Sequence, residues 1–155
     1  MSPSNPMRLV NVYREPTAAR VLYALLSDRP QESRISHRTM PDYAAHEAFV
    51  RSRPYRLWWL IRVDGGFVGD IHVTHLNEIG VFIFSAFRGN GYGAQAVKLF
   101  MARHRPLPAI KAKRIGSWLA NIAPENDDGA SFFKKLGFKK VQETWRLHQN
   151  VSSLS

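Results

Sequence analysis

The chain has 155 residues, of which 45% are hydrophobic and none is cysteine, and its formal net charge is +10. This length suits one domain with its own core, so we expect a single domain over residues 1–155. The lack of cysteine excludes disulfides, thiolate metal sites and mechanisms that hold an acyl group on a cysteine.

The first seven residues, MSPSNPM, are polar and contain two prolines, and they lack the basic-then-apolar layout of a secretory signal. We expect residues 1–7 to be loosely ordered. The longest apolar runs, such as Leu57–Ile61, are far shorter than the roughly 20 residues that a membrane helix needs. The sequence therefore predicts a cytoplasmic location and no association with a membrane.

The first third of the chain predicts a strand and two helices. The strand is expected over Arg8–Arg14, and the first helix over Thr17–Leu26, where Pro16 suits its first turn. A second helix follows Pro41 in the same way. The polar loop between the helices, SDRPQESRISHRTMP, is long, and long loops in compact domains are often functional.

Three further strands are expected in close succession, over Leu57–Val63, Phe67–Thr74 and Glu78–Phe84. The turn Asp64-Gly65-Gly66 is a strong hairpin signal, and the next junction is also short. These strands should therefore run antiparallel. The aromatic residues of PYRLWWLI are expected to be mostly core, with substrate stacking by one of them as the alternative.

The last third predicts an amphipathic helix over Ala94–His104, a strand over Arg114–Ile122, a helix over Asn126–Leu136 and a final strand region over Phe138–His148. The predicted order is β-α-α-β-β-β-α-β-α-β. We therefore expect an α/β (α+β) fold with a mixed, mostly antiparallel sheet flanked by helices.

The stretch FRGNGYGAQA joins the third of the successive strands to the central helix. Glycines between a strand and a helix leave backbone N–H groups open at a positive helix end, which favours an anion. A tightly packed turn is the alternative. No Walker string is present, and a dinucleotide fingerprint forced onto Gly91, Gly93 and Ala96 would need an acid where Lys111–Arg114 is basic.

The run Arg88-Gly89-Asn90-Gly91-Tyr92-Gly93 resembles the Arg-x-x-Gly-x-Gly/Ala loop of the GNAT superfamily of acyl-CoA-dependent N-acetyltransferases. A second stretch, PENDDGASFFKKLGF, is similar to the later motif of that family. The element order also agrees, so the resemblance covers residues 8–148. It implies an N-acetyltransferase that moves an acetyl group from acetyl-CoA to a primary amine, with coenzyme A as its product and no metal.

The resemblance also implies residues that bind the cofactor. Backbone groups on the strand before the loop would hold the pantetheine and the thioester carbonyl, the loop would hold the pyrophosphate with Arg88 at the entrance, and Asn126 matches a cofactor-side asparagine. The strand residues are Val81, Phe82 and Ile83. The loop residues are Gly89, Asn90, Gly91, Tyr92 and Gly93.

Proton transfer has two candidate residues. Glu78 lies where some members of the family place a catalytic glutamate, although it could equally be a solvated strand-end carboxylate. His37, on the loop that usually borders the acceptor site, is the second candidate, although a lone loop histidine is often a bystander. Phe133 stands where many relatives have a tyrosine, so its ring would pack along the pantetheine and could not donate a proton. His72 and His75 lie three apart on a strand and make a poor metal pair.

The stretch from Ile79 to Pro124 contains no acidic residue and seven basic ones. It would attract the phosphates of coenzyme A, or it could be a solvated basic surface. Its charge disfavours a polycationic acceptor, leaving a small molecule, an amino sugar or a protein amine. A basic nucleic-acid-binding module, or an acyltransferase that associates with nucleic acid or the ribosome, is the alternative function. The sequence is compatible with a monomer or a homodimer.

Overall fold

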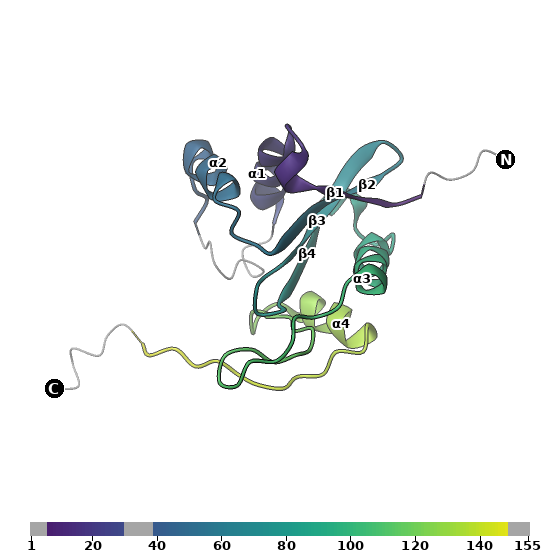
Figure 1. The fold of residues 1–155 in the computed structure, drawn as a ribbon. Coiled ribbons are helices and arrows are strands. Elements are labelled where there is room, and N and C mark those ends of the chain that lie inside the picture. The colour runs from purple at the N-terminus through teal and green to yellow at the C-terminus, as the bar shows by residue number, and fades with distance from the viewer. Residues whose placement is uncertain (1–5, 30–38, 149–155) are drawn as a thin grey trace.

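The fold is built on one four-stranded sheet, seen in the computed structural model of Figure 1, which describes residues 6–29 and 39–148. The strand order is β1-β2-β3-β4 and every neighbouring pair is antiparallel. The strands are β1 (Arg8–Asn11), β2 (Leu57–Val63), β3 (Gly66–Val73) and β4 (Ile79–Ile83). The predicted antiparallel meander is confirmed.

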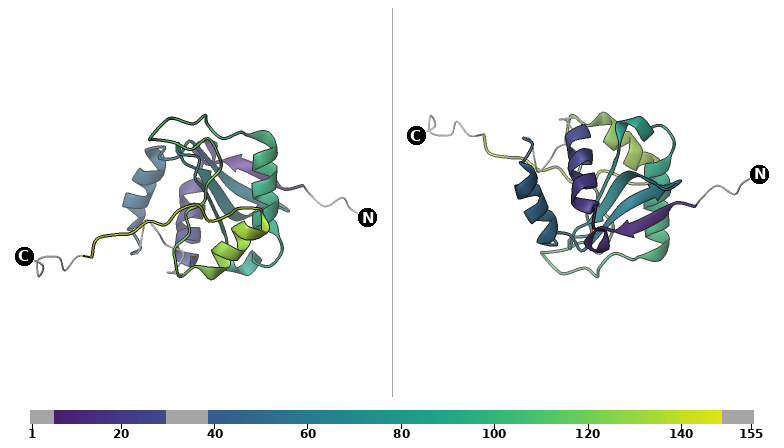
Figure 2. Two further views of the ribbon diagram at one scale, coloured as in Figure 1. Left: turned by 90° about the horizontal axis from the view of Figure 1, so that it is seen from below. Right: turned by 90° about the horizontal axis from the view of Figure 1, so that it is seen from above.

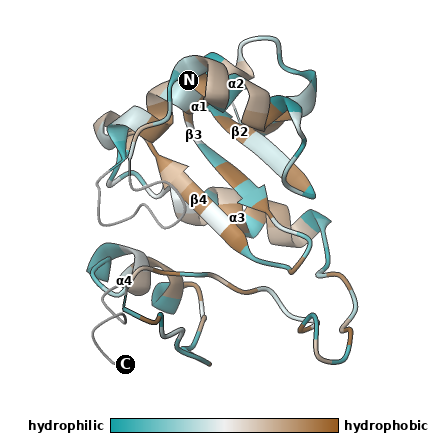
Figure 3. Cartoon of the chain, turned by 90° about the vertical axis from the view of Figure 1, so that its left-hand side faces the viewer, coloured by the Kyte–Doolittle hydropathy of each residue, from teal (hydrophilic) through white to brown (hydrophobic). Residues whose placement is uncertain are grey.

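Helices cover both faces of this sheet (Figures 1 and 3). One face carries α1 (Ala18–Asp28) and α2 (Tyr43–Arg51). The other face carries α3 (Tyr92–Arg103), and α4 (Asp127–Lys135) lies beyond β4 on that side. Two short 3-10 helices, η1 (Val12–Arg14) and η3 (Ser85–Phe87), follow β1 and β4. None of the helices in the described ranges is long and apolar enough to cross a bilayer.

The alternation of side chains along the central strands supplies two separate cores. Ile61, Ile71 and Val73 point toward α3 and pack with Phe100 of that helix. Trp58 and Leu60, the alternate residues of β2, point toward α1 and α2. Because successive residues of a strand point to opposite faces, one apolar run can serve both layers. Met7 belongs to the first core, so the polar start of the chain joins the packed structure from this residue onward.

The predicted strand Arg8–Arg14 is too long by three residues. The side chain of Asn11 accepts a hydrogen bond of 2.9 Å from the backbone N–H of Tyr13. This local bond turns the chain into η1, because an asparagine that bonds its own backbone two residues on offers an alternative to the sheet ladder.

The predicted strand Arg114–Ile122 is wrong, because only Arg114 and Leu119 within it form isolated bridges. Leu119 forms an isolated parallel bridge with Glu78, and this bridge is the parallel element in the described structure. Arg114 bonds in both directions to Ile110, which closes a tight turn, and the carbonyl of Ile115 accepts a side-chain amide. Because these backbone groups are already bonded, they cannot form a strand ladder.

The predicted strand Phe138–His148 is also wrong. The segment runs past α4 and away from the body of the domain without regular structure (Figures 1 and 2). Val141, Trp145 and Leu147 are 70%, 87% and 75% exposed. These side chains are exposed and the sheet of the described residues ends at β4, so the segment neither packs on the core nor adds a strand.

Candidate active site

The glycine loop connects β4 to α3 through η3, and two of its glycines have backbone conformations that favour glycine. Gly89 has a φ of +82° and Gly91, the N-cap of α3, has a φ of +77°. A Cβ atom built on either one would meet no atom within 4 Å. These positions therefore need glycine for their backbone and face open space, which is what close approach by an anion requires.

The first turn of α3 is open at the same place. No side chain from the described residues caps this helix. The first backbone hydrogen bond of the helix is donated by the N–H of Gln95 to the carbonyl of Gly91. The N–H groups of Tyr92, Gly93 and Ala94 precede that bond, so they are the groups a helix leaves for a ligand. A helix of 12 residues gives this end a partial positive charge.

Two polar side chains of the loop brace its backbone. Arg88 donates from Nε to the carbonyl of Ile83 over 3.2 Å, and Asn90 donates from Nδ2 to the carbonyl of Phe87 over 3.0 Å. On the other side, Asp28 at the end of α1 accepts from the N–H and the hydroxyl of Ser85. These bonds hold the pKa of Asp28 below its usual value. The loop is thus fixed at both ends.

The third glycine of the motif has a different environment. Gly93 is buried in α3, and a Cβ atom there would lie 3.1 Å from the ring of Phe132 on α4. Its small size therefore lets α3 and α4 approach, which is the packed-turn interpretation at this one position.

The outer edge of β4 carries backbone groups that leave the sheet. Ile79 donates to the carbonyl of Leu119 over 2.8 Å, and the carbonyl of Ile83 points outward to Arg88. In an antiparallel strand, the backbone N–H and C=O groups of alternate residues point to the same side. The backbone groups of Val81, which lies between Ile79 and Ile83, therefore also point away from β3. Phe82, paired with Asp70 of β3, has its backbone turned toward the sheet.

Asn77, in the turn before β4, holds the segment after α3 against the start of β4, beyond which the two separate. It is fully buried and has a φ of +65°. Its Nδ2 donates to the carbonyls of Leu107 and Ile115, and its Oδ1 accepts from the N–H of Leu107 over 2.7 Å. Sequence reasoning missed this residue, although an asparagine in a short strand-to-strand turn is the residue type that tolerates positive φ.

The α4 residues of the second motif have structural partners. Asn126 caps the helix, and its side-chain oxygen accepts a hydrogen bond of 3.0 Å from the backbone N–H of Gly129. Phe133 is buried, and its ring meets the rings of Phe132 and Phe138 edge-on. The cofactor contacts expected of both residues stay predictions.

Glu78 forms the bridge with Leu119 and directly precedes β4. Its carboxylate accepts from the hydroxyl of Thr74 over 2.9 Å and from the side-chain amide of Asn121. It is half-buried, so it is neither a free solvated carboxylate nor a core residue. His37 lies outside the described residues. Within residues 6–29 and 39–148, no group of three or more His, Asp or Glu side chains could hold a metal ion.

A mainly apolar pocket that contains one buried acid lies on the face of the sheet that carries α1 and α2. Asp70, 4% exposed, accepts from the indole N–H of Trp58 over 2.8 Å. Burial raises the pKa of Asp70 to about 7. His72 stacks on Tyr55 with ring centres 4.1 Å apart, and burial lowers its pKa to about 3. The wall is completed by Phe82 and by the following residues of the helices: Leu22, Leu25, Leu26, Arg29, His46 and Phe49.

Asp70 was not among the residues predicted from the sequence. An acid inside the apolar run GFVGDIHV was the available signal, because alternation with Ile71 places Asp70 on the same face of the strand as His72. Tyr55 and Trp58 were expected to be core, and Trp58 is buried.

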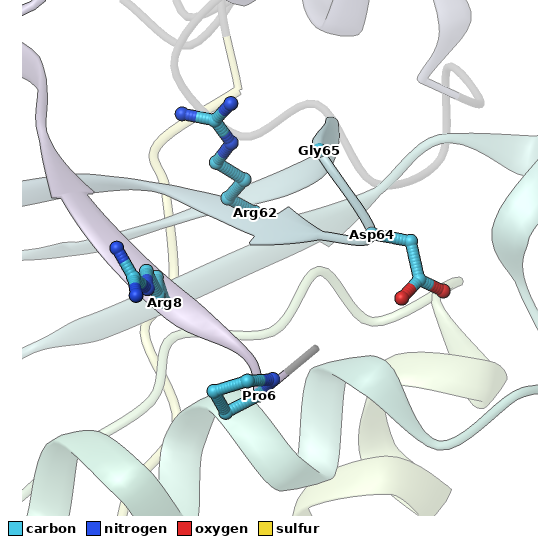
Figure 4. A pocket seen from close by; sticks show the side chains of 5 residues that line it. All are labelled: Pro6, Arg8, Arg62, Asp64 and Gly65. Atoms are coloured by element: carbon cyan, nitrogen blue, oxygen red, sulfur yellow. The ribbon is translucent and has the colours of Figure 1, made fainter. Parts of the chain in front are cut away.

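A second hollow lies at the β1 edge of the sheet, across the sheet from β4 (Figure 4). It is lined by Pro6, Arg8, Arg62, Asp64 and Gly65. It shares no residue with the glycine loop or the pocket around Asp70.

Comparison with known proteins finds a family model that matches most of the chain. The model of the Acetyltransferase (GNAT) domain family matches residues 6–139. No curated protein sequence matches the chain significantly.

Three solved structures illustrate the likeness of fold. An acetyltransferase from Thermus thermophilus has a TM-score of 0.68 at 19% identity, covering 88% of this chain and 89% of that one. A ribosomal-protein-alanine N-acetyltransferase from Brucella melitensis biovar Abortus 2308 has a TM-score of 0.63 at 14% identity, covering 92% and 97%. The aminoglycoside N-acetyltransferase AAC(6')-Iy in complex with CoA has a TM-score of 0.64 at 16% identity, covering 96% and 97%.

Proposed function

Because the chain belongs to the GNAT acetyltransferase domain family, we propose that it transfers an acetyl group from acetyl-CoA to a primary amine. The observation that carries this proposal is the open cradle at the start of α3. There, two left-handed glycines facing open space precede an uncapped helix N-terminus. A cradle of this kind suits a pyrophosphate, which is the anionic group of the donor.

The residues present fit the donor at two further points. The outward backbone groups of Val81 would bond the amides of the pantetheine arm, as an added strand bonds a sheet edge. Arg88 would stand at the entrance, and Asn90 would keep the loop in shape. Tyr92, Gly93, Asn126 and Phe133 complete the proposed donor site. The backbone contact expected of Phe82 is not proposed, because its backbone is turned toward β3 and its side chain lines the pocket around Asp70.

The chemistry requires one proton to leave the amine and one to reach the thiolate. The amine nitrogen forms a bond to the thioester carbonyl carbon, the carbon–sulfur bond breaks, and the sulfur leaves as a thiolate that takes up a proton. We assign the removal of the amine proton to Glu78, directly or through water. Its carboxylate is ionisable and lies where β4 and the Leu119 segment part.

No tyrosine is available at the position of Phe133 to protonate the thiolate. Its ring is enclosed by two other phenylalanines, so a contact with the pantetheine would be apolar. Water is therefore the proposed proton source for the leaving thiolate.

Thermal melting with coenzyme A and with acetyl-CoA tests the donor site. A ligand that binds only the folded protein raises the melting temperature, by about 2.7 kcal/mol of stabilisation at 100 times its Kd. Release of free thiol in the presence of a panel of primary amines then tests the transfer. If neither ligand shifts the melting temperature, the proposed function is wrong.

A further inference from the structure

We propose that the hollow at the β1 edge of the sheet binds a phosphate monoester through the side chains of Arg8 and Arg62. The hollow shares no lining residue with the pocket around Asp70 and lies apart from the cradle at the start of α3. The inference therefore does not rest on the proposed function. It adds a binding site that acetyl transfer does not require.

The first support is the register of the two strands that carry the arginines. Arg8 of β1 and Arg62 of β2 are direct partners across the sheet, and both are exposed. Side chains of direct partners point to the same face, with their Cβ atoms about 4.5–5.5 Å apart, and like charges in these positions destabilise the strand pair. Local conflicts of this kind concentrate at functional sites, where a ligand supplies what the fold lacks.

The second support is that no acid neutralises this pair. Within residues 6–29 and 39–148, neither Arg8 nor Arg62 forms an ion pair. Asp64 is the acid in the lining of the hollow, and its carboxylate points away from both guanidinium groups in Figure 4. The two positive charges are therefore left for an anion from solution.

The third support is that one of the two cations is already held in place. The guanidinium of Arg62 lies 5.8 Å from the centre of the Phe67 ring, and Phe67 packs against the core beneath α1. A guanidinium held against a ring still has N–H groups with which it can bind an anion. Orienting this side chain before the ligand arrives lowers the entropic cost of binding.

The class of ligand follows from the number of oxygen atoms that two arginines need. One guanidinium fork binds two oxygens of an anion. A carboxylate has two oxygens and a phosphodiester has two that are not esterified, so a single arginine uses both. A phosphate monoester has three such oxygens and a charge of about −1.5 to −2 at pH 7, so it can bond to Arg8 and Arg62 together.

The size of the hollow limits how much of the ligand it encloses. Its volume is about 260 Å³, slightly below the roughly 300–1,000 Å³ of typical small-molecule sites. A Cβ atom built on Gly65, which also lines the hollow, would meet no atom within 4 Å. The hollow therefore holds the phosphate and the nearest atoms of the group that carries it, while the rest of that group stays in solvent.

The first experiment measures binding without turnover. Methyl phosphate, dimethyl phosphate and acetate are titrated into the protein at constant ionic strength, and NMR follows the backbone amides of Arg8, Arg62 and Gly65. Methyl phosphate should shift them saturably, and the other two should bind about tenfold or more weakly. The amides of Gly89 and Gly91 report separately on the cradle. No saturable shift at the hollow overturns the inference, whatever happens at the cradle.

The second experiment separates a local site from net charge. Arg8→Gln should weaken the binding of methyl phosphate at the hollow about tenfold or more. Arg103→Gln, at an exposed position in the last turn of α3 on the other face of the sheet, makes the same change of charge and should leave this binding unchanged. Equal weakening by the two variants would contradict the site.

Thermal melting tests whether Arg8 instead has a structural role. Without phosphate, Arg8→Gln should melt at a higher temperature than the unmodified chain, because the like charge opposite Arg62 is removed. Methyl phosphate should raise the melting temperature of the unmodified chain more than that of the variant. A lower melting temperature for Arg8→Gln without phosphate would overturn the inference.

An RNA backbone is another source of phosphate, and an oligouridylate without a terminal phosphate tests it. Each of its phosphates has two oxygens that are not esterified, so it should shift the amides of the hollow no more strongly per phosphate than dimethyl phosphate does. Tighter binding than that of methyl phosphate, lost in Arg8→Gln, would assign the hollow to RNA and overturn the assignment to a monoester.

Discussion

Single glycines in the cradle can be separated by what surrounds each of them. Gly89 and Gly91 combine positive φ with open space, whereas Gly93 has ordinary backbone geometry and touches Phe132. The motif therefore mixes two physical requirements. The first two positions need room for a ligand, and the third needs room for a neighbouring helix.

Gly91→Ala should raise the KM for acetyl-CoA about tenfold or more, because the new methyl group would extend into the space proposed for the pyrophosphate. Gly65→Ala is a close control. Gly65 has a φ of +81°, close to the +77° of Gly91, and a methyl group there also meets no atom within 4 Å. Both variants should lose similar stability from backbone strain. Equal KM values for the two would contradict the donor site.

Phe133→Tyr tests the assignment of the ring on α4. A hydroxyl added to a buried ring lowers stability somewhat when it lacks a partner, but the acid role is not needed if water protonates the thiolate. At least part of the activity should remain in the thiol-release assay. Complete loss of activity in a protein that still melts cooperatively would show that Phe133 has another role.

Among the elements, the short turn between β3 and β4 also positions a segment that is distant in the sequence. Asn77 bonds to Leu107 and Ile115, so it ties the segment after α3 to the start of β4. The bridge at Leu119 follows four residues later, and beyond it β4 has no strand neighbour on its outer side among the described residues. One side chain therefore sets where the edge of β4 opens.

Asn77→Ala should lower the free energy of unfolding by about 2–4 kcal/mol, since three buried hydrogen bonds are lost at a positive φ. Asn77→Gly removes the same bonds but relieves the backbone, so it should be less destabilising than alanine. Urea unfolding measures both. If alanine costs less than glycine, the positive φ at this residue is not a source of strain.

The elements that could be predicted from the sequence are those with local causes. Leu57–Val63 was predicted to the residue, because its alternation and the Asp64-Gly65 turn lie within the strand and its own hairpin. Arg114–Ile122 was not, because the carbonyl of Ile115 and the N–H of Leu119 bond to the distant Asn77. Asp70 was missed for a similar reason, since an acid in a strand shows its burial only once the helices above it are placed.

For the whole molecule, the pocket around Asp70 couples folding to pH through two opposed groups. The pKa of His72 is lowered to about 3, so the stability that its neutral form provides is lost as the pH falls below 6.5. The pKa of Asp70 is raised to about 7, so the stability of its neutral form is present near pH 4 and is lost as the pH rises through 7. Between about pH 4 and pH 6.5, the change in stability from Asp70 and the opposite change from His72 nearly cancel.

Asp70→Asn should remove this cancellation. Relative to the unmodified chain, its free energy of unfolding should fall by about 1.4 kcal/mol for each pH unit of acidification between about pH 6.5 and 4.5. His72→Gln should show the opposite slope. Urea unfolding at several pH values measures both. Parallel pH profiles for all three proteins would show that neither group has the shifted pKa on which this prediction depends.

The outer edge of β4 beyond the Leu119 bridge has a consequence for how the protein behaves at high concentration. An unpaired strand edge is a template on which another chain can add, and native proteins usually cover or charge such edges. Here the cover would be the donor molecule itself. Light scattering should therefore show slower self-association when coenzyme A is present, so occupancy of the site would protect the solubility of the protein as well as start its reaction.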